Sequence, residues 1–265
     1  MSAWDITSAV FDATNFFDYS ADSTDSTTIA FTDSGSTLLI LFNTFAAPVI
    51  RKYSLGQTWK VNTASYQSVH PVSGGENIAV SGPKVYVVNA GDVIYQYSLP
   101  TLSYDGLFKS VSAQDTGMIG LCFSSDGANL YTVGVTNGRI YHYTLVAGDI
   151  STAVYTGEFL SINAQDGLAR GIVLKEDGTR LYVYGQSNDT IYEYTLPSAF
   201  SLSGATYSGV SYGADLPAGG QGLAFSTGGG TFFVSDSNWN TVYAWNMSPP
   251  VPAPFWTNYI KCFEV

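Results

Sequence analysis

Amide, carboxylate and indole side chains that could recognise a sugar recur at corresponding places along the chain. Amides and carboxylates hydrogen-bond to hydroxyl groups, and a tryptophan ring at a loop tip can anchor a ligand. The candidate ligand-binding residues are Gln114, Asp115, Asn137, Gln165, Asp166, Asn188, Asp215, Asn238 and Trp239, together with Gln221. A structural role is the alternative, because Asp and Asn also hydrogen-bond to the backbone of their own turns.

Residues that commonly hold metals or move protons are few. His142 occupies the variable position of a Tyr-x-Tyr pattern, so we expect an outward-facing strand residue, and His70 precedes Pro71 in an expected loop. Residues 236–240 (Asp-Ser-Asn-Trp-Asn) begin like a calcium loop, but the glycine and the final glutamate of that motif are absent. We therefore expect no metal and no cofactor.

The composition narrows the class of protein. The chain has 265 residues, of which 45% are apolar, 15% aromatic and only 12% charged, and this excludes intrinsic disorder. The net charge of −11 argues against a nucleic-acid partner. We expect no membrane insertion, because no apolar run approaches the roughly 20 residues of a membrane helix, and the start of the chain lacks the features of a signal peptide.

The elements that must position the candidate residues form a repeat. Residues 120–134 and 171–185 align without a gap, as do their continuations 139–145 and 190–196. Weaker copies on both sides place the apolar anchors Phe31, Val80, Phe123, Leu174 and Phe225 about 43 to 51 residues apart. Each copy contains four short strands separated by turn signals, a pattern typical of the blades of a β-propeller.

The two ends of the chain indicate five blades. The first three strands occur five times, and the last copy runs into the Pro-rich residues 248–254 without a fourth strand. The missing strand is found at the other end, where residues 6–11 (Ile-Thr-Ser-Ala-Val-Phe) match the fourth-strand pattern. We predict an all-β, five-bladed β-propeller over residues 1–247, with a strand at about 4–12 that completes the last blade and closes the ring.

The strands expected to line the central channel of this ring carry no catalytic groups. Residues 29–31, 78–80, 121–123, 172–174 and 223–225 contain no carboxylate, histidine or hydroxyl nucleophile. A glycosidase needs two carboxylates at a fixed separation. We therefore expect that the protein is not an enzyme, although loops could still supply acids over the channel.

The repeat also resembles a known group of propeller repeats. The match depends on residues 4–9 (Trp-Asp-Ile-Thr-Ser-Ala), 114–116 (Gln-Asp-Thr), 165–166 (Gln-Asp) and the two strong copies, and it covers about residues 3–247. These residues are similar to the repeats of many phage and marine bacterial proteins that are often labelled lactonase-like. The resemblance implies the propeller fold; the label implies no lactonase activity, because no catalytic residue of those enzymes maps onto this sequence.

An aromatic peptide follows the Pro-rich spacer. We expect residues 248–265 to lie outside the ring, where the peptide either packs on the side of the propeller or docks on another chain by strand addition. Its candidate docking residues are Phe255, Trp256, Tyr259, Ile260 and Phe263.

These observations lead to one functional expectation and one alternative. The resemblance and the docking peptide favour a non-enzymatic structural or binding protein of a phage particle, tail-associated or decorating the head, located in the virion and attached to other virion proteins through the C-terminal peptide. The alternative is a lectin-like module that binds surface glycans through the Asn, Asp and Trp residues of the loop face.

Overall fold

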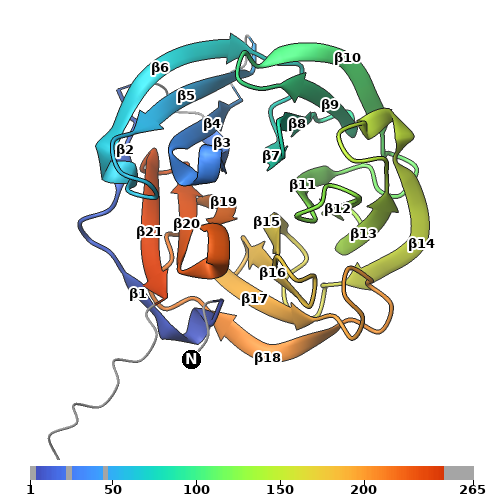
Figure 1. Ribbon diagram of the computed structural model, residues 1–265. Coiled ribbons are helices and arrows are strands. Elements are labelled where there is room, and N and C mark those ends of the chain that lie inside the picture. The colour runs from blue at the N-terminus through green and yellow to red at the C-terminus, as the bar shows by residue number, and fades with distance from the viewer. Residues whose placement is uncertain (1–3, 22–25, 44–46, 248–265) are drawn as a thin grey trace, which may run out of the picture.

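The computed structural model describes residues 4–21, 26–43 and 47–247, and it shows five antiparallel sheets arranged in a ring (Figure 1). Blade 1 contains β3 (Ser26–Thr32), β4 (Thr37–Phe42), β5 (Val49–Leu55) and β6 (Ala64–Pro71). Blade 2 contains β7 (Asn77–Ser81), β8 (Lys84–Val88), β9 (Val93–Ser98) and β10 (Ser103–Ser110). Blade 3 contains β11 (Met118–Phe123), β12 (Asn129–Gly134), β13 (Arg139–Thr144) and β14 (Val154–Ser161).

Blade 4 contains β15 (Ala169–Leu174), β16 (Arg180–Gly185), β17 (Thr190–Thr195) and β18 (Thr206–Tyr212). Blade 5 contains β19 (Gly220–Phe225), β20 (Thr231–Asp236) and β21 (Thr241–Met247), to which the N-terminal strands β1 (Ala9–Phe11) and β2 (Phe17–Asp18) are added. The described residues also form the short 3-10 turns η1 (Ile6–Ser8), η2 (Asp33–Gly35), η3 (Val61–Thr63), η4 (Ile150–Thr152) and η5 (Thr227–Gly229). The predicted all-β, five-bladed propeller is confirmed.

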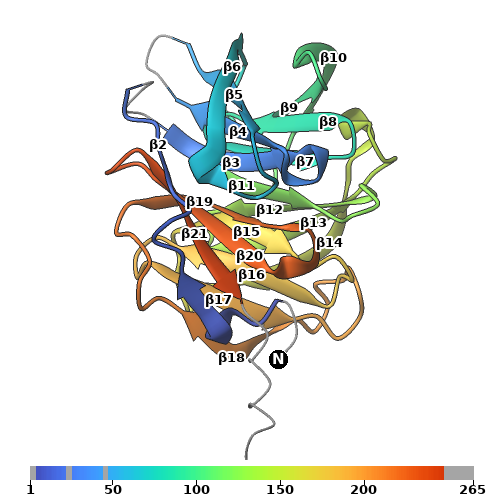
Figure 2. The same cartoon turned by 60° about the vertical axis from the view of Figure 1, so that its left-hand side comes forward.

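The N-terminal strand closes the ring, as predicted. Ala9 pairs with Met247 and Phe11 with Trp245, so β1 is the outer neighbour of β21 (Figure 2). This fourth strand is shorter than the predicted 4–12 and is divided in two, because η1 precedes β1 and a turn separates β1 from β2. Asp12 stabilises that turn by accepting a hydrogen bond from the backbone N–H of Thr14 at 3.1 Å.

Strand sequences follow their depth in each blade. All six residues of β4 are buried, and the second strands of blades 3 and 4 are almost entirely buried, which explains their continuous apolar runs. The fourth strands alternate exposed and partly buried residues because one of their faces meets solvent.

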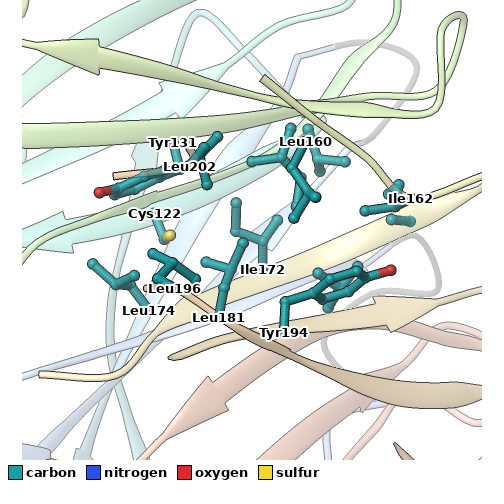
Figure 3. Packing of buried hydrophobic residues seen from close by; sticks show 14 residues of the cluster. Cys122, Tyr131, Leu160, Ile162, Ile172, Leu174, Leu181, Tyr194, Leu196 and Leu202 are labelled. Carbon is teal, nitrogen blue, oxygen red and sulfur yellow. The ribbon is translucent and has the colours of Figure 1, made fainter. Parts of the chain in front are cut away.

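The core lies between neighbouring blades. Figure 3 shows the cluster between blades 3 and 4, in which Cys122 and Tyr131 of one blade meet Ile172 and Leu181 of the next. The inner strands approach so closely that a Cβ at Gly171 would lie 2.8 Å from the backbone nitrogen of Leu223, so this position requires glycine.

Candidate functional site

The five inner strands β3, β7, β11, β15 and β19 surround the central channel (Figure 1). Its volume is about 170 Å³, and three consecutive apolar residues of each strand line it. They are Ile29, Ala30, Phe31, Ile78, Ala79, Val80, Leu121, Cys122, Phe123, Ile172, Val173, Leu174, Leu223, Ala224 and Phe225.

In blade 3, three of the candidate ligand-binding residues hold two loops together. The Asp115 carboxylate, which is 3% exposed, accepts a hydrogen bond from the backbone N–H of Asn137 at 3.0 Å. The Asn137 amide donates to the carbonyl of Gln114 at 3.3 Å, and the Tyr143 hydroxyl donates to the Gln114 side chain at 2.8 Å. These contacts join the loop that enters the blade to the turn between its second and third strands.

Blade 4 repeats this arrangement. Asp166 accepts from the backbone N–H of Asn188 at 3.1 Å, Asn188 donates to the carbonyl of Gln165 at 3.2 Å, and Tyr194 donates to the Gln165 side chain at 3.1 Å. The strand residue beside the carboxylate is Gly185, where an added Cβ would overlap Asp166. The Gln-Asp pairs therefore cap the inter-blade turn in both blades, as the structural alternative in the sequence analysis describes.

Blade 5 departs from the repeat at every position of this network. The strand pairings align Leu216-Pro217 with the Gln-Asp pairs, Trp239 with Asn188, and Trp245 with Tyr194. The carboxylate is supplied by Asp236, which stands in the position of Gly185 and accepts from the backbone N–H groups of Asn238 (2.7 Å) and Trp239 (3.3 Å). The indole of Trp239 is thus not tied to the neighbouring loop, and 72% of this residue is exposed.

A pocket of about 250 Å³ opens where blade 5 lacks the network. It is lined by Phe11, Asp215, Pro217, Trp239, Tyr243 and Trp245. The ring of Phe11 lies 6.0 Å from that of Tyr243 and 5.5 Å from that of Trp245, centroid to centroid, so three aromatic rings form one wall. We call this the blade 5 pocket.

Among the described residues that line the pocket, Asp215 is the one acidic side chain. The exposed carboxylate of Asp215 accepts a hydrogen bond from the Tyr212 hydroxyl at 3.3 Å. Burial raises the pKa of Tyr212 to about 12, and the negative charge of Asp215 acts in the same direction. Tyr212 therefore stays a neutral donor at neutral pH.

Two of the candidate ligand-binding residues, Asp215 and Trp239, come together in this pocket. The other candidates in blades 3 and 4 make the turn contacts described above. Four lining residues were not predicted from the sequence: Phe11, Pro217, Tyr243 and Trp245. The signal that could have found them is the departure of the fifth repeat from the pattern of the third and fourth.

Both histidines lie in other surroundings than expected. His142 is 6% exposed rather than outward-facing; Nδ1 lies 2.9 Å from Glu158 Oε2, Nε2 lies 3.0 Å from Asn129 Oδ1, and the ring stacks on Tyr131. The prediction failed because this strand position holds polar residues that pair inside the blade. His70 lies in β6 and not in a loop, and burial lowers its pKa, with a smaller effect from Lys52.

No group of three His, Cys, Asp or Glu side chains that could hold a metal occurs in residues 4–21, 26–43 and 47–247. In the same ranges no helix is long and apolar enough to span a membrane. The candidate docking residues Phe255, Trp256, Tyr259, Ile260 and Phe263 lie outside the described residues.

No family model matches the chain, and no curated protein matches it. The chain is similar to a solved structure from Bacteroides uniformis named a putative 6-phosphogluconolactonase, with 14% identity, a TM-score of 0.53, and coverage of 78% of this chain and 63% of that one. A second structure with this name, from Bacteroides fragilis, has 12% identity, a TM-score of 0.52, and coverage of 79% and 63%. A functionally unknown protein from Desulfotomaculum acetoxidans has 12% identity, a TM-score of 0.52, and coverage of 85% and 71%.

These likenesses show the fold alone, and the chain spans less than two thirds of the length of the first two neighbours. They support the lactonase-like part of the resemblance. The prediction that the chain is not an enzyme is wrong, because the neighbours of this fold include two that are named as enzymes. That prediction considered only the strands along the channel, whereas loops at the ends of a rigid scaffold also carry catalytic groups.

Proposed function

We propose that the chain binds carbohydrate in the blade 5 pocket. The single observation that carries this proposal is the grouping of the exposed Trp239 with Tyr243, Phe11 and the Asp215 carboxylate around one cavity. Aromatic rings offer flat apolar surfaces to the C–H face of a sugar, and a carboxylate accepts hydrogen bonds from its hydroxyl groups.

The volume of the pocket favours a small ligand. At about 250 Å³ it lies just below the range of about 300–1,000 Å³ that is common for small-molecule sites. We infer that it takes one sugar unit, such as the terminal residue of a longer glycan, while the rest of the glycan stays in solvent.

A glycan array followed by calorimetric titration of the full chain tests the proposal. Trp239→Ala is expected to weaken binding about tenfold or more, because it removes the exposed anchor of the site. Asn188→Ala is the matched control, since Asn188 occupies the equivalent position in blade 4, and its binding should equal that of the wild type. Absence of glycan binding, or equal affinity of Trp239→Ala and the wild type, would overturn the proposal.

Attachment to a phage particle remains a proposal that is supported by the repeat resemblance. It concerns residues 248–265, so it is tested separately from the pocket. Light scattering of the full chain and of a chain ending at Met247, each mixed with purified virions, should show capture of the full chain only. Capture of both forms would remove this role from the C-terminal peptide.

Lactone hydrolysis is a second candidate activity, and it rests on the names of two neighbours of the same fold. The assay incubates the full chain with 6-phosphogluconolactone and monitors the acid that hydrolysis releases. A rate that exceeds the spontaneous rate in proportion to protein concentration supports the activity. A rate equal to that of buffer alone excludes this substrate.

A further inference from the structure

One described arginine lies at a β-bulge of an inner strand. Arg170 lies in β15 between Ala169, which pairs with Gly185, and Gly171, which pairs with Tyr184. The register therefore shifts by one residue, and Arg170 is the extra residue of a β-bulge. Bulges of this kind re-aim a side chain and are frequent next to binding sites.

Four inner strands, β3, β11, β15 and β19, have a bulge at the same level. The register shifts at Thr27 in β3, at Ile119 in β11 and at Gln221 in β19, and each of these residues, like Arg170, lies two positions before the first residue of its strand that lines the channel. Ile119, Arg170 and Gln221 therefore belong to one end of the channel, on the side where the loops enter the blades.

Asn77 ties three inner strands together at this end of the channel. Its side-chain amide donates to the carbonyl of Ile119 at 3.1 Å and to the carbonyl of Arg170 at 3.2 Å. Because Asn77 belongs to blade 2 and the two carbonyls belong to blades 3 and 4, these bonds connect three inner strands of the ring. The Asn77 side chain thus holds the backbone carbonyl of Arg170 in place.

A hydrogen bond fixes the orientation of the Arg170 guanidinium, but no carboxylate among the described residues balances its charge. Its Nε donates to the Gln186 side chain at 2.7 Å, which fixes the plane of the group. Within residues 4–21, 26–43 and 47–247, no carboxylate lies within ion-pairing distance of it, and its two terminal nitrogens have no hydrogen-bond partner. Burial lowers the pKa of Arg170, while the more distant charge of Glu76 opposes that effect.

We propose that Arg170 forms an anion-binding site at this end of the propeller, which takes a carboxylate or phosphate group of a small ligand. A planar guanidinium presents paired N–H donors that match the oxygens of either group. The site is separate from the blade 5 pocket, because no residue lines both, and it does not rest on the proposed carbohydrate binding.

Nuclear magnetic resonance titration of the labelled full chain tests the site. Sodium phosphate and sodium acetate are the two probes, each added at constant ionic strength, and the backbone amides of Ile119, Gln186 and Gln221 are the reporters. Saturable shifts of these amides with phosphate only assign a phosphoryl ligand, and saturable shifts with acetate only assign a carboxylate ligand. Shifts with both assign the general anion site, and absence of saturable shifts with both overturns the proposal.

Variants identify the responsible group. Arg170→Gln should abolish the titration, whereas Arg139→Gln, which changes an arginine that lies over the Phe159 ring, should titrate like the wild type. Arg170→Lys keeps the charge at the bulge and loses the planar pair of donors, so its affinity should fall about tenfold. This variant keeps the test valid if Arg170→Gln fails to fold; wild-type affinity in a folded Arg170→Gln chain overturns the proposal.

Discussion

The carboxylate of Asp236 is the clearest case of a single residue whose charge opposes folding. It is completely buried, and its Oδ2 has no hydrogen-bond partner among the described residues. Burial raises its pKa, the backbone N–H groups of Asn238 and Trp239 lower it, and the charge of Asp189 raises it further. The folded protein therefore favours the protonated form of Asp236. The stability that this protonated form provides is fully present below the ordinary pKa of 3.8, and it is lost as the pH rises through the raised pKa.

Asp236→Asn should stabilise the protein at neutral pH. The amide keeps an oxygen acceptor for the two backbone N–H groups and removes the buried charge, so the melting temperature should rise by a few degrees at pH 7 and not at about pH 3. Asp166→Asn is the control: both oxygens of Asp166 accept backbone N–H groups, those of Leu168 and Asn188, so this variant should melt lower. Equal melting of wild type and Asp236→Asn across this range would contradict the prediction.

Glu158 shows the opposite behaviour. Burial alone would raise its pKa, but hydrogen bonds from His142, from the Ser201 hydroxyl and from the backbone N–H of Leu202 outweigh burial and hold the pKa below its ordinary 4.5. The stability that it provides is present above pH 4.5 and is lost as the pH falls through the lowered value.

Glu158→Gln should therefore lower the free energy of unfolding by about 1–2 kcal/mol at pH 7, because a charge-assisted network between blades 3 and 4 is weakened. Urea unfolding of both proteins at several pH values measures the difference, which should shrink below pH 4.5 as the wild-type carboxylate protonates. An undiminished difference in acid would mean that packing rather than charge is responsible.

At the scale of strands and loops, blades 3, 4 and 5 each place a carboxylate where it accepts backbone N–H groups of the turn between the second and third strands. In blade 4 the loop residue Asp166 fills the space that Gly185 leaves beside β16, and in blade 5 Asp236 supplies the carboxylate from the strand itself. The same hydrogen-bond acceptor is thus delivered from two different places in the sequence. In blade 5 the strand residue Asp236 supplies this acceptor, so the loop that enters the blade need not provide it. The blade 5 pocket lies at this position.

A double-mutant cycle tests this coupling. Gly185→Ala alone should destabilise the protein by about 1–3 kcal/mol, because the added methyl group overlaps the Asp166 carboxylate. Combined with Asp166→Ala, it should add almost nothing to the effect of Asp166→Ala alone, since the space is then empty. Additive effects in chemical denaturation would show that Gly185 is required for its backbone and not for the space.

Periodicity explains why the fold could be predicted and most of the pocket could not. Alternation and recurring turn signals identify strands and blades, because each blade must bury the same faces. The pocket instead arises where residues such as Leu216 and Trp245 break the repeat, and its wall includes Phe11, which lies 234 residues from its strand partner Trp245. The register of a strand added from the other end of the chain is needed before these residues can be seen as neighbours.

The whole molecule depends on that N-terminal segment for closure. Ile6 is completely buried in the cluster between blades 4 and 5, and Trp4 stacks on Phe225 at 4.9 Å while its carbonyl accepts from the Tyr182 hydroxyl at 2.7 Å. The segment therefore ties blade 4 to blade 5 and also covers the outer edge of β21. β1 and β2 together cover the edge of β21 at residues 245–247 and 241–242, which shields it from pairing with another chain.

Removal of residues 1–11 should open the ring. The loss of Trp4 and Ile6 removes buried area from a core cluster, so we expect destabilisation by at least about 3 kcal/mol, and the exposed edge of β21 should promote self-association. Thermal melting and light scattering measure both effects, with a chain that starts at Trp4 as the control. A synthetic peptide of residues 1–18 added to the truncated chain should restore the monomer and raise its melting temperature, because the peptide can pair with β21 in trans. If the truncated chain stays monomeric and melts like the control, the N-terminal strand is not needed to close the ring.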